Sequence, residues 1–280
     1  MTGTIVYQGE PGAYSHLACQ DGFPDMTPKP CASFAAAFAQ VSSGAATLAM
    51  IPVENTVAGR VSDIYHLLPE GGLSIIGEQY LAVHHQLLAV PGTKLSEIKT
   101  ARSHPMALGQ VRKRLSSMGI KPVADVDTAG AAQSVAQLGD KSVAAIASSL
   151  AAQTYGLEIL AADIEDAAHN TTRFLILADE PLNVPKDNGP VVTSFVFKVR
   201  SVPSALYKAL GGFATNGINM TKLESYMVGG SFQAAQFYAD VEGHPEDDGM
   251  KHALEELSFF SESVTMLGTY PAHSSRSHKS

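Results

Sequence analysis

A chain of 280 residues, 45% apolar and 16% charged, is long enough for one large or two ordinary domains with an ample hydrophobic core. Its net charge of −8 is spread along the sequence, which argues against the basic footprint of a nucleic-acid-binding protein. No secretory signal and no apolar stretch long enough to span a bilayer is apparent, and Cys19 and Cys31 lack metal-binding spacing. We therefore expect a cytoplasmic protein with buried free thiols and no nucleic-acid or membrane partner.

The N-terminal part alternates short apolar strands with helices. Residues 4–8 are rich in β-forming side chains, and the glycine-rich turn at 9–16 then opens a helix. A helix N-terminus exposes unpaired N–H groups and a partial positive charge, so a carboxylate could dock at this turn. Ser33 is placed to cap a second helix, and residues 47–51 form a continuous apolar strand typical of a buried parallel sheet.

The next segment continues this alternation and carries two adjacent histidines. A polar cluster at 54–60 precedes a helix, and residues 73–76 and 81–90 are predicted strands. His84 and His85 lie in the second of these strands. Because neighbouring strand residues point to opposite faces, these two cannot bind one metal ion together, and we expect no metal site.

Four more strands are predicted at 99–102, 122–126, 142–146 and 159–164, with one long helix at 105–118. Such alternation favours α/β layers with mainly parallel sheets, in which ligands bind beyond the carboxyl ends of the strands. Polar clusters lie at six strand ends, and we expect about half of them to line a shared cleft and the rest to serve only as helix caps. These clusters are residues 9–16, 54–60, 103–104, 127–128, 148–149 and 170–173.

The last of these clusters is the richest in hydrogen-bond donors. It places Asn170, Thr171, Thr172 and Arg173 directly before the apolar run 175–178. Such a cluster suits a small substrate that carries a carboxylate and an oxygen in need of a proton. The alternative is a capped turn in which the arginine pairs with a nearby acid, and these residues alone leave the two interpretations evenly balanced.

The pattern changes after residue 178. The segment rich in proline and asparagine that follows is predicted to be a linker, with 183–190 between the two domains. Residues 191–272 follow a βαββαβ order, typical of a small ferredoxin-like α+β domain, with Ser204 as the cap of its first helix and a turn at Gly229-Gly230. The polar tail 273–280 is predicted to be disordered.

Four motifs, in this order along the chain, resemble those of bacterial prephenate dehydratases. They are Gly9-Glu10-Pro11-Gly12-Ala13-Tyr14-Ser15-His16, Pro52-Val53-Glu54-Asn55-Thr56 with Gly59, Ser103-His104-Pro105, and Asn170-Thr171-Thr172-Arg173-Phe174. The C-terminal part resembles an ACT regulatory domain in Gly217-Ile218-Asn219 and Leu223-Glu224-Ser225. The resemblance implies a catalytic domain of two α/β lobes over residues 1–182, like the periplasmic-binding-protein fold, with the site in the cleft between the lobes. Since no chorismate mutase segment precedes Met1, it also implies a monofunctional enzyme.

The resemblance further implies an activity, the conversion of prephenate to phenylpyruvate, water and carbon dioxide in phenylalanine biosynthesis. It implies no cofactor, feedback by phenylalanine at the ACT domain, and a homodimer or homotetramer. The implied catalytic residues are Thr172, Arg173 and Phe174, and the implied substrate contacts are Ser15, Asn55, Thr56, His104, Asn170 and Thr171. The implied phenylalanine contacts are Pro203, Ser204, Ala205, Leu206, Asn219, Leu223, Glu224 and Ser225.

Two motifs depart from the family pattern, and both concern the effector site. The family's Glu-Ser-Arg-Pro stands here as Glu224-Ser225-Tyr226-Met227, and its Pro-Gly-Ala-Leu as Pro203-Ser204-Ala205-Leu206. Tyr226 and Met227 are neighbours, so on a strand one should point inward and the other outward. We expect a phenylalanine site that is kept with an altered rim.

The reaction suggests a division of roles among the cluster residues. An ion pair to the ring carboxylate would stabilise a charge that must vanish, so we expect Arg173 to hold the pyruvyl carboxylate instead, and Thr172 to donate to the leaving hydroxyl. Glu54 is expected to be structural. For both cluster residues to face the cleft, the turn must extend through Thr172 and strand pairing must begin near Phe174. Arogenate as the substrate and a non-catalytic amino-acid sensor remain open alternatives.

Overall fold

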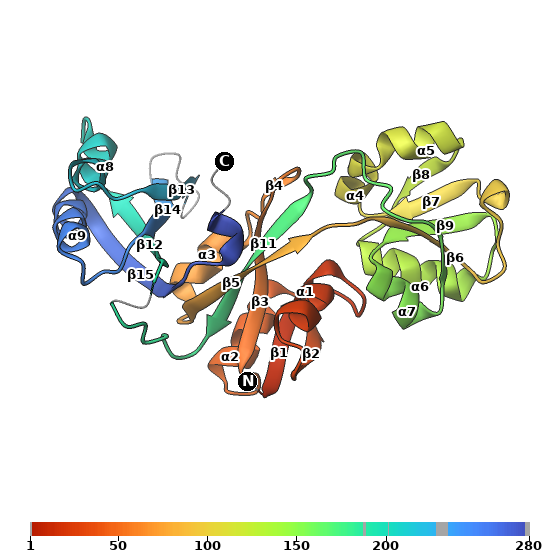
Figure 1. Ribbon diagram of the computed structural model, residues 1–280, viewed down its shortest axis with the longest axis horizontal. Helices are drawn as coiled ribbons and strands as arrows, with labels where there is room; N and C mark the ends of the chain where they lie inside the picture. Colours follow the sequence, from red (N-terminus) through yellow and green to blue (C-terminus); the bar gives the residue numbers. More distant parts are fainter. Residues whose placement is uncertain (1, 187–188, 201, 228–234, 278–280) are drawn as a thin grey trace. The chain divides into compact units, whose positions relative to one another are not determined.

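The computed structural model describes residues 2–186, 189–200, 202–227 and 235–277 (Figure 1). The chain forms two compact units, each assembled from segments far apart in the sequence. The first unit comprises Met1–Gln40, Ala49–Val61 and Gln79–Phe174, and the second Val41–Leu48, Ser62–Glu78 and Leu175–Ser280. No helix in the described ranges combines the length and the apolar composition that crossing a membrane requires.

The first sheet has the strand order β2-β1-β3-β11-β5, with the short β4 paired to β3. The strands are β1 (Gly3–Gln8), β2 (Met26–Cys31), β3 (Leu48–Asn55), β4 (Gly59–Arg60), β5 (Ser74–Ala82) and β11 (Thr171–Ala178), and the helices between them are α1 (Tyr14–Gly22), α2 (Phe34–Ser42) and α3 (Ile64–Glu70). β1 and β2 are parallel. Ser33 caps α2 as predicted, because its Oγ accepts a hydrogen bond from the Ala36 N–H at 3.1 Å.

The second sheet lies within the first unit and has the order β10-β6-β9-β7-β8. Its strands are β6 (Gln86–Ala89), β7 (Thr100–Ser103), β8 (Lys121–Ala124), β9 (Val143–Ala147) and β10 (Glu158–Ala161), and a 3₁₀ turn, η1 (Leu95–Glu97), precedes β7. β7 is parallel to β8 and β9, whereas β6 is antiparallel to β9 and β10. The expectation of mainly parallel sheets therefore fails for β6, which enters the sheet directly from β5 without a crossover helix.

The helices between the strands of this sheet along the chain are α4 (Pro105–Gln110), α5 (Arg112–Met118), α6 (Thr128–Leu138) and α7 (Ser149–Tyr155). The single helix expected at 105–118 is thus wrong, because it breaks at Val111. The backbone N–H groups of Lys113 and Arg114 donate to the Asp166 carboxylate at 2.9 and 3.2 Å, and the Gln110 carbonyl accepts from the Asp166 N–H at 2.7 Å. Asp166 therefore ends one helix and caps the next, and this fixes Gln110 at the end of α4.

The strand expected at 81–90 is also interrupted. The Val83 N–H donates to the Asn170 carbonyl at 2.8 Å, and the His85 N–H donates to a Glu165 carboxylate oxygen at 2.9 Å. Because these N–H groups bond outside any strand ladder, β5 ends at Ala82 and β6 begins at Gln86.

The C-terminal segment has the predicted βαββαβ order. It consists of β12 (Val191–Val199), α8 (Ala205–Thr215), β13 (Met220–Met227), β14 (Ala235–Glu242), α9 (Asp248–Phe260) and β15 (Ser261–Pro271), and its antiparallel sheet has the order β13-β14-β12-β15. Phe195 and Phe197 of the sheet pack with Phe213 of α8 and Leu257 of α9 in a buried core. The predicted Gly229-Gly230 turn lies outside the described residues.

Two local expectations for this segment are wrong. Ser204 does not cap α8 with its side chain, because it adopts a left-handed conformation with φ 62°. The tail is not disordered up to residue 277, since a short 3₁₀ turn, η2 (Ser274–Ser277), follows β15. The Arg276 guanidinium of this turn lies 2.5 and 2.9 Å from the Glu78 carboxylate and 3.6 Å from the Asp240 carboxylate, and both of these carboxyl side chains are fully buried.

Candidate active site

The expected cleft is a cavity of about 280 Å³ in the first unit. This is close to the lower end of the roughly 300–1,000 Å³ common for small-molecule sites. Five of the six predicted polar clusters contribute to its wall, and only 148–149 does not. The lining residues are Tyr14, Ser15, Pro52, Asn55, Ala58, Val61, Val83, His85, His104, Met106, Ala107, Gln110, Asp127, Thr128, Thr172 and Phe174. Within the described part of the chain, no lysine or arginine lines this cavity.

The Thr172 hydroxyl lies at the centre of a directed hydrogen-bond arrangement. Asn55 Nδ2 donates to Thr172 Oγ1 at 3.0 Å and to Asn170 Oδ1 at 2.8 Å. The orientation of the Asn55 amide is fixed, because its Oδ1 accepts from the backbone N–H groups of Val57 and Ala58 at 2.9 and 2.8 Å. Since Thr172 Oγ1 accepts a hydrogen bond from Asn55, its own O–H can donate to a ligand in the cavity.

The buried Asn170 extends this hydrogen-bond arrangement from Asn55 to Gln110, at the end of α4. Its Nδ2 donates to Gln110 Oε1 at 3.0 Å, and Gln110 Oε1 also lies 2.6 Å from His85 Nε2. His85 Nδ1 lies 2.7 Å from the Tyr14 hydroxyl. Burial lowers the pKa of His85, against smaller opposing effects of the Gln110 hydrogen bond and the Glu165 charge, so the imidazole is held in its neutral form.

Strand β11 divides the predicted catalytic residues between its two faces. Its pairing begins at Thr171, and not near Phe174 as expected. Thr172 and Phe174 line the cavity, whereas Thr171 and Arg173 do not. The expectation that Arg173 faces the cavity is therefore wrong, because adjacent residues in a paired strand point to opposite sides.

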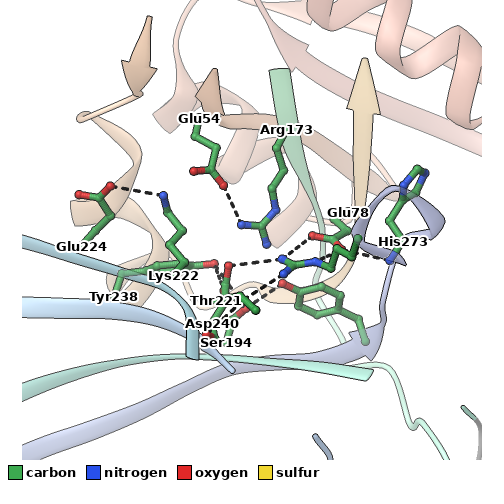
Figure 2. A network of polar contacts seen from close by, with 12 residues as sticks. Glu54, Glu78, Arg173, Ser194, Thr221, Lys222, Glu224, Tyr238, Asp240 and His273 are labelled. Carbon is green, nitrogen blue, oxygen red and sulfur yellow. Dashed lines mark hydrogen bonds and ion pairs between the residues drawn. The ribbon is translucent and has the colours of Figure 1, made fainter. Parts of the chain in front are cut away.

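Arg173 has a structural partner on its own face of β11. Its guanidinium, 4% exposed, lies 3.0 Å from the Glu54 carboxylate, as Figure 2 shows. Glu54 thus has the structural role expected for it. For Arg173, the structure therefore matches the alternative interpretation of the cluster, in which the arginine pairs with a nearby acid.

Three other expected substrate contacts have different surroundings. Thr56 does not line the cavity, because its hydroxyl donates to the His169 carbonyl and accepts from the Thr171 N–H at 2.9 Å. His104 does line it, and its Nδ1 accepts the Met106 N–H at 3.2 Å at the start of α4. Ser15 lies in the first turn of α1, and no side chain within the described part of the molecule caps that helix.

The remaining polar groups near the cavity are mostly structural. Ser148 caps α7 and donates to the Gly12 carbonyl at 2.6 Å. His84 faces away from His85 and pairs with Glu165 at 2.8 Å, with Asp163 at 3.7 Å. These three groups lie close enough to share a cation, but each carboxylate also accepts a hydrogen bond from another group, Asp163 from Gln86 Nε2 at 3.0 Å and Glu165 from the His85 N–H at 2.9 Å.

Sequence reasoning missed three residues of the site, Tyr14, His85 and Gln110. Tyr14 stands in a recognised motif, but as a turn residue. The segment around His85 is apolar, and Gln110 lies within a helical pattern, so neither carried a signal. Gln110 reaches the cavity wall because the helix breaks at Val111, and His85 reaches it because the strand is interrupted at 83–85.

The expected phenylalanine contacts lie in the second unit, on α8 and β13 and beside them. Ala205 is buried and Leu223 is exposed. Asn219 Nδ2 donates to the Glu242 carboxylate at 2.9 Å, and Glu224 pairs with Lys222 at 3.4 Å. As expected, Tyr226 is 8% exposed and points inward, whereas Met227 is 52% exposed and points outward.

Two larger cavities, of about 450 and 550 Å³, lie in the second unit and are lined mainly by residues around 181–191 and 242–247. Neither contains a residue of the four sequence motifs. The fold and the 280 Å³ cavity together define a protein with a small-molecule site, lined by apolar side chains and a few hydrogen-bonding ones.

Comparison with known proteins gives the particular family. The family model "Prephenate dehydratase" matches residues 5–182. The chain is 52% identical, over 96% of its length and 95% of the relative's, to the bifunctional N-acyl-homoserine lactone acylase/prephenate dehydratase of Komagataeibacter europaeus. It is 42% identical, over 95% of its length and 71% of the relative's, to arogenate dehydratase/prephenate dehydratase 1 of Arabidopsis thaliana.

A structural comparison gives the same family as these sequence comparisons. Prephenate dehydratase from Arthrobacter aurescens in complex with L-Phe superimposes with a TM-score of 0.87 at 30% identity, covering 96% of this chain and 89% of that one. The chain belongs to the prephenate dehydratase family, whose members are lyases.

Proposed function

We propose that the cavity converts prephenate to phenylpyruvate, water and carbon dioxide, with Thr172 as the donor to the leaving hydroxyl. The observation that carries this proposal is the hydrogen bond from Asn55 Nδ2 to Thr172 Oγ1, which leaves the threonine proton free to donate into the cavity. A threonine hydroxyl is a very weak acid, so it polarises the departing C–O bond and does not release its proton fully. A proton taken up from the bulk solvent neutralises the departing hydroxide, so that the prephenate dianion and one proton give the phenylpyruvate anion, water and carbon dioxide.

The two substrate carboxylates need different surroundings. The ring carboxylate leaves as carbon dioxide, and the electrons of its C–C bond become part of the aromatic ring while the C–O bond breaks. An apolar environment favours this loss of charge, and the cavity offers Pro52, Val61, Val83, Met106 and Phe174.

The pyruvyl carboxylate requires donors, and Arg173 is on the wrong face of β11 to supply them. We assign it to the first turn of α1, at Tyr14 and Ser15, where no side-chain cap competes among the described residues. The helix dipole and the first-turn N–H groups stabilise an anion there. His104 and Gln110 complete the donors around the substrate. Asn55 acts through Thr172, because both of its amide hydrogens are given to Thr172 and Asn170. Thr56, Asn170 and Thr171 support these residues from outside the cavity.

The deciding experiment is turnover of prephenate, followed by the ultraviolet absorbance of phenylpyruvate. Wild-type protein should form the product, and Thr172→Ala should form it far more slowly. A pure, folded protein that leaves prephenate unchanged would refute the proposal and would favour the non-catalytic amino-acid sensor.

Arogenate is the second candidate substrate, and Asp127 favours it. The Asp127 carboxylate lines the cavity, and one of its oxygens caps α6 by accepting the Gly130 N–H at 2.7 Å. A carboxylate beside the substrate would attract the ammonium group of arogenate and repel the prephenate dianion. Asp127→Asn keeps the capping oxygen and removes the charge, so it should raise the ratio of prephenate to arogenate turnover.

We also propose that the chain is monofunctional, with prephenate dehydratase as its one activity. The relative from Komagataeibacter europaeus carries an acylase activity in its name. Incubation of one preparation with N-acyl-homoserine lactone and with prephenate tests this directly. Release of the fatty acid by wild type, and its loss in a cavity variant such as Thr172→Ala, would contradict monofunctionality.

We further infer that residues 191–272 form an ACT regulatory domain joined by the linker 183–190 to a catalytic domain of residues 1–182. The βαββαβ order and the family match that ends at residue 182 support this division. The free, buried Cys19 and Cys31 fit the reducing cytoplasm.

Phenylalanine is the proposed effector, at an interface between two copies of this domain in a homodimer or homotetramer. The related structure with bound L-Phe supports it. Calorimetry on the full chain should show phenylalanine binding, and bound phenylalanine should lower turnover through linkage of the two sites. Absence of binding at millimolar phenylalanine, with the dimer confirmed by light scattering, would leave the domain a structural role only.

A further inference from the structure

Six side chains of the first unit form one continuous hydrogen-bond chain across the cavity wall. It runs from Thr172 through Asn55, Asn170, Gln110 and His85 to Tyr14. Every contact along it is 2.6–3.0 Å long. Such a chain has a direction, because each amide oxygen can only accept and each amide nitrogen can only donate.

The direction is set at the Asn55 end. Asn55 Oδ1 is held by the N–H groups of Val57 and Ala58, so Nδ2 must face Asn170. Asn170 therefore presents Oδ1 to Asn55 and Nδ2 to Gln110. Gln110 in turn must present Oε1, which leaves its amide nitrogen for the cavity that it lines.

The same logic fixes the proton on His85. Gln110 Oε1 already accepts from Asn170, and it lies 2.6 Å from His85 Nε2. A lone pair on Nε2 would face the lone pairs of this oxygen, so Nε2 carries the proton. The neutral ring then has its lone pair on Nδ1, and the Tyr14 hydroxyl at 2.7 Å is the donor that this atom needs.

We propose that Tyr14 and His85 are positioning residues, and that Tyr14 holds His85 in the neutral Nε2–H tautomer that keeps the Gln110 amide nitrogen turned toward the substrate. The proposal deepens the dehydratase function and rests on it for the kinetic effect. In the opposite tautomer, Tyr14 would donate to the His84 carbonyl, 3.1 Å away, and Gln110 would have to reverse against Asn170.

The protonation states of the groups around His85 agree with this arrangement. Burial, with the Glu165 charge nearby, raises the pKa of Tyr14, so the phenol keeps its proton. The charged or titratable groups beside the ring are Glu165, which binds the His85 backbone N–H at 2.9 Å, His84, Tyr14 itself, and His104 and Asp127 in the same cavity wall.

Nitrogen-15 spectra of histidine-labelled protein test the tautomer directly, because the two neutral forms have different patterns of protonated and unprotonated ring nitrogens. The full chain has ten histidines, and His85→Gln identifies the signal by its disappearance. Wild type without substrate should show the Nε2–H form near neutral pH. Tyr14→Phe should shift the His85 signal toward a mixture of forms.

Kinetics supply the second measurement. Tyr14→Phe removes one neutral hydrogen bond and should lower kcat/KM for prephenate roughly five- to tenfold. His84→Gln is the matched control, since His84 is exposed and pairs with Glu165 outside the cavity, and it should leave both the spectrum and kcat/KM close to wild type.

The outcomes separate this proposal from the function on which it rests. An Nδ1–H or doubly protonated His85 in wild type near neutral pH overturns it, even if Tyr14→Phe fails to fold. A Tyr14→Phe protein with unchanged spectrum and unchanged kcat/KM also overturns it. An Nε2–H signal in a protein that does not turn over prephenate would refute only the dehydratase assignment.

Discussion

Asn55 Nδ2 and Thr172 Oγ1 lie 3.0 Å apart, and the amide is the donor. The Thr172 hydroxyl, which we propose as the donor to the leaving hydroxyl, is thus oriented by a residue that comes 117 positions earlier in the chain. Because the Asn55 amide is itself fixed by two backbone N–H groups, the orientation exists before substrate arrives. Such preorganisation is what makes a weak donor effective in a transition state.

Thr172→Ala should lower kcat with little change in KM, because the hydroxyl acts mainly as the C–O bond breaks. Loss of one such donor costs about 3 kcal/mol, or roughly 100-fold in rate. Steady-state kinetics with prephenate measure this. Thr172→Ser keeps the donor and should recover much of the rate. Equal impairment of the two variants would mean that the methyl group's packing matters and the donor role is wrong.

Arg173→Leu should reduce stability more than substrate binding. It removes the partner of Glu54, and because Glu54 is partly exposed we expect a loss of about 2 kcal/mol in the free energy of unfolding. Urea unfolding measures the loss, and KM for prephenate should change little. Glu54→Gln removes the other charge of the same pair, so it should lower the free energy of unfolding by a similar amount and leave KM for prephenate nearly unchanged. A large rise in KM at unchanged stability would restore the arginine to the substrate site.

Acid should destabilise the protein partly through His85 and His16, whose pKa values are lowered by burial. In the unfolded chain both protonate near pH 6.5, whereas in the folded chain they stay neutral to lower pH. The unfolded state therefore binds more protons as the pH falls below about 6.5, and the free energy of unfolding decreases, by at most about 1.4 kcal/mol per pH unit for each group.

The contribution of His85 is measured by urea unfolding of wild type and His85→Gln at about pH 7.5 and pH 5.5. The variant should lose less stability between the two pH values than wild type does. An identical loss would show that His85 is protonated equally in the folded and unfolded states.

Arg276→Ala should destabilise the protein by about 3 kcal/mol, because it removes the guanidinium that lies against the buried carboxylates of Glu78 and Asp240. Arg276→Lys should recover only part of this, since an ammonium cannot make the two parallel bonds to Glu78. Lys198→Ala removes an exposed pair with Glu262 and should cost less than about 1 kcal/mol. Urea midpoints that are the same for the Arg276 and Lys198 variants would contradict this.

The sequence predicted well where local patterns decide the outcome. Apolar strands, the cap at Ser33 and the inward and outward positions of Tyr226 and Met227 follow from residue periodicity and hydrogen-bonding chemistry. Polar strand ends also predicted half of the residues that line the cavity, since strand ends at one edge of a sheet converge.

The misses share a different cause, which is long-range pairing. Arg173 was expected in the cavity because a turn was assumed before Phe174, and only pairing of β11 from Thr171 onward turns it away. The break at Val111 depends on Asp166, and the order of the tail depends on Arg276 reaching Glu78. No local pattern contains these contacts, because each joins residues more than 50 positions apart.

The contact between Glu78 and Arg276 spans 198 positions of the sequence. A ribosome adds roughly 5–20 residues per second, so the acid emerges about 10–40 s before the base that neutralises it. During that interval the Glu78 carboxylate lacks the Arg276 guanidinium, and burying it is correspondingly more costly. The packing around Glu78 can thus be completed only when synthesis is nearly finished, and a chain that stalls or is cut before residue 276 would leave the surroundings of Glu78 more open to proteases and chaperones.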